Sequence, residues 1–538
     1  MKRPFPETSN QKSKVAAIDV GSNSIHLLVA ETNASGEITQ VIETAKDQTR
    51  LGEALGERLL LDADAMNRAA TALKRMKDIA DSHGARIRAI GTHAMREAKN
   101  GREFASRLLK KTGVNVEIVS GQEEARLVYL GVQQGLSIHE KSTLVVDIGG
   151  GSTEILVGQW GEERFSTSLK LGAVRLTQKY IKTEQLADSD LAEMRRYVMA
   201  RLEPIIIEIR RVGFDFAVGS SGTIKAIKSL ALGLQNKPQP TSFHGEILTS
   251  SEIRLAVQAI ERAKSLRERK LLPNMDSKRA DIIVAGAIIL DTLTQLAGIS
   301  EWTISLTAIR EGIIHDTLVR DQAWVKGDPA DIRWRSVRAF GQKVHVDEIH
   351  AWHITSLSVS LFDQLRKRHN LSLEWREYLR SAAYLHECGR FLGYTGHHKH
   401  AFYLLRHACL LGFSTRELDA IALIVRYHRK RAPRDNDEVY SELEPDEKFG
   451  VRCCGAILRV AVSLDRGRQG KIQEIRLVDL GAQLRMDVHL RGSQDISLEM
   501  YHASSEKMHF EAAFGVGLQI GTAFFSNPAT SFVKPSTS

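Results

Sequence analysis

The sequence predicts a duplicated α/β fold, followed by an all-α region and a small β-rich C-terminal module. From Lys14 to about Leu318, β-branched runs alternate with helical stretches, which is typical of a sheet covered by helices on both faces. Residues 331–470 show long helical patterns with almost no β-runs. Between residues 472 and 510 an alternation with a period of two returns, which indicates strands.

Each α/β half has its own set of predicted elements. Short β-branched runs predict strands, and an apolar period near 3.6 predicts amphipathic helices. In the first half we predict strands at 15–20, 26–31, 87–92 and 116–120 and a helix at 62–84. In the second half we predict strands at 143–148, 154–158 and 216–219 and a helix at 251–266. In the C-terminal module we expect strands at 475–480, 484–490 and 496–501.

The changes in pattern predict four domains between polar ends. The expected domains are 14–140 and 141–325 for the two α/β halves, 326–470 for the helical region and 471–525 for the C-terminal module. Residues 1–13 and 526–538 are polar or rich in Ser, Thr and Pro, so we expect them to be disordered.

Composition narrows the class of protein. The chain has 538 residues, of which 43% are hydrophobic and 26% charged, and this excludes a mainly disordered or collagen-like chain. The net charge of +9 suits a polyanionic partner. Four cysteines are too few for a disulfide framework and suggest reduced thiols. No apolar run approaches the roughly 20 residues of a membrane span, so we expect a cytoplasmic protein without a membrane partner.

An internal repeat is the most informative feature of the sequence. The stretches VAAIDVGSNSIHLLVAE and LVVDIGGGSTEILVG align without a gap, with Asp19 on Asp147 and Gly21 on Gly149. Both have the order strand, Asp, apolar residue, Gly, small residues, strand. The match predicts two related halves, each of which opens with a hairpin around a Gly/Ser-rich turn.

These turns suit the binding of phosphate. Small residues let successive backbone N–H groups point into one concavity, and such nests bind anions. The predicted cradles are Gly21, Ser22, Asn23 and Ser24; Gly149, Gly150, Gly151 and Ser152; and a third loop of Gly219, Ser220, Ser221, Gly222 and Thr223 before a helix. Asp19 and Asp147 stand at strand ends beside the nests, where a carboxylate can hold Mg²⁺.

At these residues the sequence resembles the exopolyphosphatase/guanosine pentaphosphate phosphohydrolase (Ppx/GppA) family, most closely its long exopolyphosphatases. The matching stretches are AAIDVGSNSIHLLVAE, GTHAMREA, SGQEEARLVYLGV, VVDIGGGSTEILVG, AVGSSGTIKAI and AIREGIIHD. The resemblance implies two actin-like phosphotransferase halves and, after them, a helical domain related to the HD phosphohydrolases. It also implies a homodimer.

The resemblance assigns roles to individual residues. A glutamate of GQEEAR is the expected general base, either Glu123 or, preferred from the motif, Glu124. Asp147 and Glu154 match carboxylates implicated in Mg²⁺ binding and catalysis, with Mn²⁺ as a possible substitute for Mg²⁺. Arg96 and Arg279 match basic residues near the phosphate.

The resemblance implies a Mg²⁺-dependent exopolyphosphatase that releases orthophosphate from the end of inorganic polyphosphate. Hydrolysis of guanosine pentaphosphate, alone or as a second activity, is the nearest alternative. A kinase or ATPase and a sensor without turnover are more distant ones. We expect no nucleic-acid partner, because no RNP, KH, helix-turn-helix or zinc pattern is present.

The helical region adds two expectations. Nine histidines lie between His345 and His407, but the pair that should be His-Asp is His386-Glu387, and no downstream Asp follows in ALIVRYHRK. We therefore expect a relic of the fold rather than a working metal site. The basic cluster Arg429, Lys430 and Arg431 is the predicted track for a polyphosphate chain.

Overall fold

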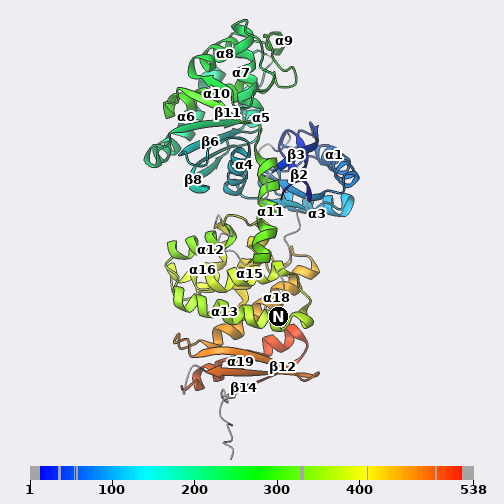
Figure 1. Cartoon of the computed structure of the whole chain (residues 1–538), viewed down its shortest axis with the longest axis vertical. Helices are drawn as coiled ribbons and strands as arrows, with labels where there is room; N and C mark the ends of the chain where they lie inside the picture. Colours follow the sequence, from blue (N-terminus) through cyan, green and yellow to red (C-terminus); the bar gives the residue numbers. More distant parts are fainter. Residues whose placement is uncertain are drawn as a thin grey trace, which may run out of the picture. The chain divides into compact units, whose positions relative to one another are not determined.

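The computed structural model describes most of the chain as two compact units, Met1–Asp331 and Ile332–Ser538 (Figure 1). The described residues are 13–33, 38–53, 55, 58–183, 185–326, 332–408, 410–490 and 494–523. The two ends expected to be disordered, 1–13 and 526–538, lie outside these ranges, except that Ser13 begins the first strand. The predicted division into four domains stays a prediction.

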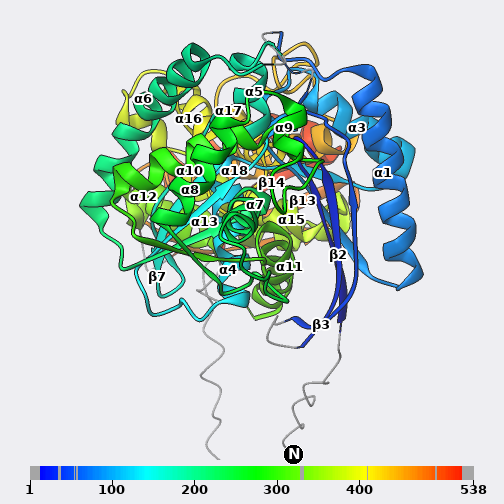
Figure 2. The same ribbon diagram turned by 90° about the horizontal axis from the view of Figure 1, so that it is seen from above.

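The first sheet of unit 1 has five strands in the order β3-β2-β1-β4-β5. Its strands are β1 (Ser13–Val20), β2 (Ile25–Thr32), β3 (Ile38–Asp47), β4 (Arg86–Gly91) and β5 (Val116–Ile118). The central strand β1 runs antiparallel to β2 and parallel to β4. Helices α1 (Ala63–Ser82), α2 (His93–Glu97) and α3 (Gly101–Thr112) pack on one face of this sheet (Figure 2).

The second sheet repeats this order over five strands and adds a sixth, β10, at one edge. Its order is β10-β11-β9-β6-β7-β8, where the central strand β6 runs antiparallel to β7 and parallel to β9. The strands are β6 (Thr143–Ile148), β7 (Thr153–Gln159), β8 (Glu162–Leu169), β9 (Phe216–Ser220), β10 (Ile247–Thr249) and β11 (Glu301–Ile304). The helices are α5 (Ala173–Tyr180), α6 (Asp188–Val212), α7 (Ser221–Leu234), α8 (Ser250–Arg262), α9 (Leu266–Lys270) and α10 (Ile283–Ala297). The predicted duplication of an α/β half is confirmed.

Two helices pack between the inner faces of the sheets. They are α4 (Gly121–Gly135) and α11 (Ile309–Lys326), which lie side by side in Figures 1 and 2. Their apolar side chains share one buried cluster with residues of β1, β2, β6 and β7. The two helices approach closely because glycines face the partner backbone: a Cβ at Gly131 would lie 1.6 Å from Ala308 O, and one at Gly312 would lie 1.8 Å from Leu127 O.

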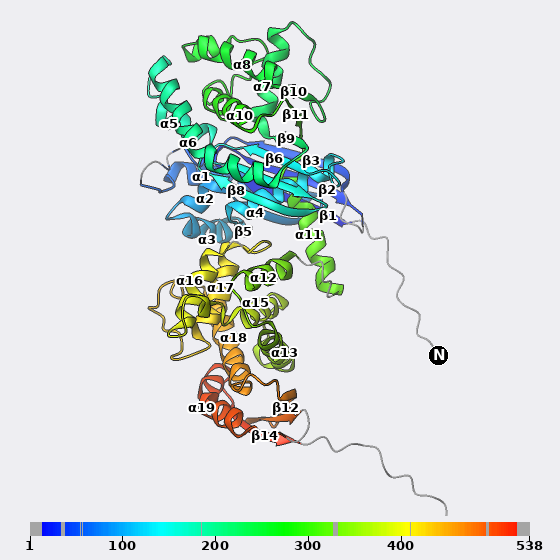
Figure 3. The same ribbon diagram turned by 90° about the vertical axis from the view of Figure 1, so that its left-hand side faces the viewer.

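Unit 2 begins with helices and ends with a small sheet (Figure 3). The helices are α12 (Ile332–Lys343), α13 (Glu348–Gln364), α14 (Arg366–His369), α15 (Leu373–Leu385), α16 (His397–His407), α17 (Thr415–Tyr427) and α18 (Pro445–Leu464), with a short 3₁₀ turn at Cys388–Phe391. The sheet has the order β12 (Ile472–Asp479), β13 (Gln483–Leu490), β14 (Gly517–Ala523), and α19 (Ser497–Phe514) precedes its last strand. The expected likeness of the helices to an HD-type domain stays a prediction.

The strand predicted at 496–501 is wrong. These residues open helix α19, which buries Ala503 and Phe510, two turns apart on one face, and ends at Gly515 with a φ of 63°. A six-residue alternation fits a strand and a helix start equally well, and the uninterrupted stretch after it decides for the helix. Within the described residues no helix is both long and apolar enough to span a bilayer.

The contact between α4 and α11 generates a stability prediction. Gly312→Ala should destabilise unit 1 by about 1–3 kcal/mol, because the new methyl group would meet backbone that cannot rotate away. Denaturant unfolding followed by circular dichroism measures the change. Gly455→Ala is the matched helical control: its nearest atoms lie 4.0 Å away, so we expect a neutral or slightly stabilising effect. Equal midpoints for Gly312→Ala and wild type would contradict the prediction.

Candidate functional site

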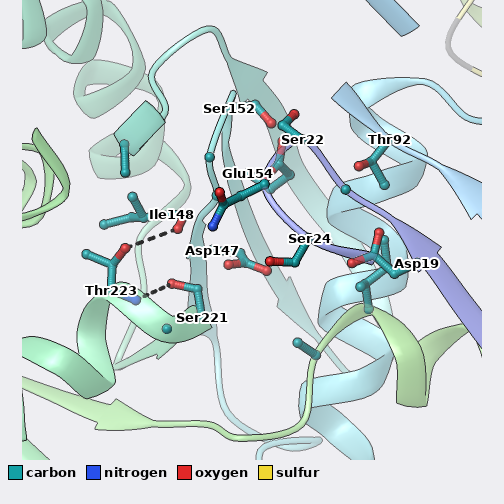
Figure 4. Close-up of a pocket in the computed structure, with 18 of the residues that line it drawn as sticks. Asp19, Ser22, Ser24, Thr92, Asp147, Ile148, Ser152, Glu154, Ser221 and Thr223 are labelled. Carbon is teal, nitrogen blue, oxygen red and sulfur yellow. Dashed lines mark hydrogen bonds between the residues drawn. The ribbon is translucent and has the colours of Figure 1, made fainter. Parts of the chain in front are cut away.

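A cavity of about 410 Å³ lies in unit 1, and the three predicted phosphate loops meet in its wall (Figure 4). The first two loops contribute all eight of their predicted residues. From the third, Ser221, Gly222 and Thr223 reach the cavity, whereas Gly219 and Ser220 form the end of strand β9 behind them. The structure thus brings together loops that are up to 200 residues apart in the chain.

The first two loops have the same backbone turn and face each other. In one, Gly21 N donates to Ser24 O over 3.1 Å; in the other, Gly149 N donates to Ser152 O over 2.9 Å. A Cβ at Gly150 would lie 3.3 Å from Asn23 Cβ, so the opposite loop leaves little room for a side chain there. Two facing turns of this kind can hold a phosphoryl group between them.

The third loop places Arg279 beside the cavity. Ser220 stands at the N-cap position of helix α7 but makes no side-chain cap hydrogen bond, so the start of the helix offers backbone N–H groups next to the loop, where Thr223 N donates to Ser221 Oγ. A Cβ at Gly222 would lie only 1.9 Å from Arg279 Nη2, and the guanidinium therefore rests directly on the glycine. Burial lowers the pKa of Arg279. Arginine side chains are effectively always protonated in proteins, so the guanidinium brings a positive charge to the cavity.

Four carboxylates line the same cavity, and their negative charges repel one another. Burial, followed by the charge of Glu124, raises the pKa of Asp19 to about 8 and that of Asp147 to about 6. The same two causes raise the pKa of Glu154 well above its usual range. Asp147 and Glu154 are direct partners across strands β6 and β7. Asp19 Oδ1 is buried without a hydrogen-bond partner, so this group of oxygens suits a divalent cation.

Glu124 and Arg96 form a fixed pair at the start of helix α4. Arg96 Nη1, from helix α2, donates to Glu124 Oε2 over 2.7 Å and to Val119 O over 3.2 Å. The side chain of Glu124 lines the cavity, whereas Arg96 lies behind it. Arg96 therefore orients Glu124.

Glu123 occupies a different environment from its neighbour. Its oxygens accept from Arg126 at 2.7 and 2.8 Å, and Arg126 also binds Asp316 of helix α11. Asp316 in turn binds Arg88 of strand β4 over 2.6 Å. Glu123 thus belongs to a buried ion network that joins α4, α11 and β4, and the structure does not bring it to the cavity.

Several residues of the cavity wall escaped the sequence analysis. Arg310 lowers the pKa of Asp19 by its charge, and the residue stands within the AIREGIIHD stretch that was singled out without a role for the arginine. His93 lies next to the second loop, since a Cβ at Gly151 would meet its Nδ1 at 2.5 Å. Further wall residues are His26, Thr92, Lys225, Ser305 and Ala308.

The predicted polyphosphate track lies in unit 2. Both oxygens of Asp437 accept from Arg431, at 2.5 and 2.7 Å, so this charge is already matched. Arg429 donates to His397, and Arg459 Nη1 donates to the backbone oxygen of Lys430. The track stays a prediction. Arg431 is the least suited of the three residues to bind polyphosphate, because its charge is already paired with Asp437.

Comparison with known proteins gives a family for both units. The model of the Ppx/GppA phosphatase family matches residues 28–321, and that of Ppx/GppA phosphatase domain III matches residues 332–506.

Relatives with known names cover most of the chain. A guanosine-5'-triphosphate,3'-diphosphate pyrophosphatase of Vibrio cholerae is 30% identical over 476 residues, which are 87% of this chain and 90% of that protein. One of Pseudoalteromonas atlantica is 28% identical over 462 residues, 85% of this chain and 87% of its own.

Solved structures match a little more than half of the chain. An exopolyphosphatase from Cytophaga hutchinsonii is 25% identical with a TM-score of 0.52 and covers 57% of this chain and 98% of its own. A Ppx/GppA family member from Aquifex aeolicus is 28% identical with a TM-score of 0.50 and covers 58% and 99%.

The crowded carboxylates predict how stability depends on pH and metal. An acid whose pKa is raised by folding stabilises the fold at low pH, and this contribution is lost as pH rises, here from about 4 to about 8. A divalent cation should offset the loss, so its addition should raise Tm more at about pH 8 than at about pH 5. Differential scanning fluorimetry measures this, and Asp19→Asn should weaken the dependence. An equal gain in Tm at both pH values would refute it.

Proposed function

Since the chain belongs to the Ppx/GppA phosphatase family, whose members hydrolyse phosphoanhydride bonds, we propose that it removes the terminal phosphate of guanosine pentaphosphate. The sequence alone led us to expect inorganic polyphosphate first and the nucleotide second. The named relatives that span most of the chain support the opposite order. The observation that carries the proposal is the cavity that residues of the three Gly/Ser-rich loops line together with Glu124.

The residues of the cavity fit a divalent cation such as Mg²⁺, or Mn²⁺ in its place. Asp147 and Glu154 would hold it, with Asp19 near by, because these buried carboxylates otherwise repel one another. When bound, the cation supplies positive charge to the phosphate oxygens.

The residues of the chain account for the other needs of the reaction. The loop N–H groups bind the terminal phosphates, and Arg279 and Arg310 add charge where oxygens become more negative. Glu124, held by Arg96, accepts a proton from water as the water oxygen bonds to the terminal phosphorus. The bond from that phosphorus to the bridging oxygen breaks, and orthophosphate and guanosine tetraphosphate leave.

Inorganic polyphosphate is the second candidate substrate. Its support is a group of cations around Arg279: the pKa of Lys46 on strand β3 is lowered by burial first and then by the charge of Arg279, with Lys278 and Arg310 adding to it. Closely spaced cations suit a repeating polyanion. The likeness to an exopolyphosphatase structure supports the same substrate class.

Substitution of the two adjacent glutamates tests the role of Glu124. Glu124→Gln should lower kcat by about 10²–10⁴-fold, because the amide cannot accept the proton, while substrate binding persists. Glu123→Gln is the matched control: it disturbs a buried ion pair and should lower Tm, yet leave kcat of the folded protein close to wild type. Steady-state phosphate release and fluorimetry measure both. Wild-type turnover by Glu124→Gln would refute the assignment.

Direct comparison of substrates tests the proposed preference. Phosphate release with Mg²⁺ is measured from guanosine pentaphosphate and from long-chain polyphosphate at equal enzyme concentration. We expect the larger kcat/KM for the nucleotide, because the full-length relatives carry that activity in their names. A larger kcat/KM for polyphosphate would restore the order expected from the sequence. Binding of both substrates without turnover would favour a sensor, and phosphate transfer to an acceptor other than water would favour a kinase.

A further inference from the structure

Three histidines from different helices of unit 2 meet in its buried interior. His350 lies in the first turn of α13, and His386 and His428 follow the last residues of α15 and α17. The ring of His386 lies 5.4 Å from that of His350 and 5.5 Å from that of His428, measured between centroids. All three side chains are buried. A core that gathers three imidazoles needs an explanation, because apolar side chains would pack there at lower cost.

The same ring nitrogen is bound to an oxygen in each of the three histidines. Nδ1 of His350 contacts Asp465 Oδ2 at 2.8 Å, Nδ1 of His386 contacts Ala383 O at 2.8 Å, and Nδ1 of His428 contacts Val425 O at 2.6 Å. A carbonyl oxygen only accepts, so the proton of His386 and of His428 is on Nδ1. The lone pair is therefore on Nε2, which is the arrangement found in metal-ligating histidines.

Among the described residues, the second ring nitrogens of His386 and His428 have no hydrogen-bond partner. Nε2 of His386 and Nε2 of His428 are both buried and unpartnered, in residues that are 1% and 2% exposed. An unsatisfied buried polar atom costs about 1–3 kcal/mol, and here two occur side by side.

A carboxylate completes the group. Ligand atoms of His350, His386 and Glu387 lie within 4.8 Å of one another. An ion with bonds of about 2.1 Å spans about 4.2 Å at most between two ligands, so small side-chain rotations suffice to close the site. Arg390 and Arg468 both bind Glu387 Oε2, which orients this carboxylate.

The expectation of no metal site rested on two features of the sequence. One was glutamate in place of aspartate at 387, and the other was that no downstream aspartate follows in the stretch ALIVRYHRK. The structure supplies that aspartate as Asp465, directly after helix α18, 115 residues from the histidine that it contacts. Its second oxygen accepts from Gly470 N, so Asp465 is itself held in place.

We propose that His350, His386 and Glu387 form a binding site for a divalent transition-metal cation of the zinc and cobalt class, with His428 adjacent and Asp465 orienting His350. Imidazole nitrogens favour such ions, whereas Mg²⁺ and Ca²⁺ prefer oxygen ligands. The site therefore differs in ligand chemistry from the carboxylate group of the phosphate cavity. It stands independently of the proposed hydrolase function.

Cobalt titration of the full-length, metal-free protein tests the proposal. Co²⁺ is added in the presence of excess Mg²⁺, which occupies oxygen-rich sites, and binding is followed by visible absorption and calorimetry. We expect saturable binding with ligand-field bands of nitrogen and oxygen donors, and displacement by Zn²⁺. His386→Ala should weaken binding by at least about 100-fold, and Asp465→Asn by about 10–100-fold, since it removes the partner that orients a ligand.

A matched histidine serves as the control. His369 is also buried in unit 2, but Nε2 contacts Phe362 O and Nδ1 accepts from Leu371 N, so it has no nitrogen to offer. His369→Gln should bind Co²⁺ like wild type. Glu387→Gln is a second test in case His386→Ala fails to fold, with an expected loss of at least about 10-fold. No Co²⁺ binding by wild type, or wild-type affinity in folded His386→Ala, Asp465→Asn and Glu387→Gln, would overturn the proposal.

Discussion

Mutual repulsion among four carboxylates in one cavity is the constraint on which the architecture of unit 1 depends. Asp19, Asp147, Glu124 and Glu154 line this cavity; the two glutamates are buried and the two aspartates are partly exposed. Their charged forms are costly there, as the raised pKa values of three of them show. Positive charge must therefore surround them, and Arg96, Arg279 and Arg310 together with the loop N–H groups provide it. A cation beside an anionic substrate would offset the repulsion between the substrate and these carboxylates.

Such an arrangement requires a rigid support. Glu124 is carried by a helix that packs against α11 through two glycines, with no room for adjustment. The ion network of Glu123, Arg126, Asp316 and Arg88 fastens that helix to α11 and to strand β4. Buried ion pairs add little net stability, but they penalise every arrangement in which a partner is lost. The network therefore holds helix α4 against α11 and β4, whereas Arg96 orients the side chain of Glu124.

The sequence predicted features that are local in the chain and missed those that depend on tertiary contacts. The repeat located Asp19, Asp147 and both turns, because strand, turn and strand are contiguous. Glu123 and Glu124 could not be told apart without the motif, since burial of both depends on packing of α4. Nothing in the sequence around Arg310 indicates that it lines the cavity, although the stretch AIREGIIHD that contains it was singled out.

The same limit applies to unit 2. The partnership of His350 with Asp465 joins residues that no spacing rule connects. The start of helix α19 was mistaken for a strand because residues 496–501 alternate between apolar and polar. In both cases the missing information is which surface the rest of the fold presents to the segment.

The duplicated hairpins differ at one register position. Asp19 pairs across the strands with His26, and Asp147 pairs with Glu154, so corresponding positions hold a neutral ring in one half and a carboxylate in the other. The turn between the strands is unchanged, because its hydrogen bond joins backbone atoms of residues three apart in the chain and does not involve this position. After a gene duplication, single replacements at this position could thus adapt one half of the protein to catalysis and the other to substrate binding, without changing the path of the backbone. Symmetry of the scaffold and asymmetry of its function are compatible for this reason.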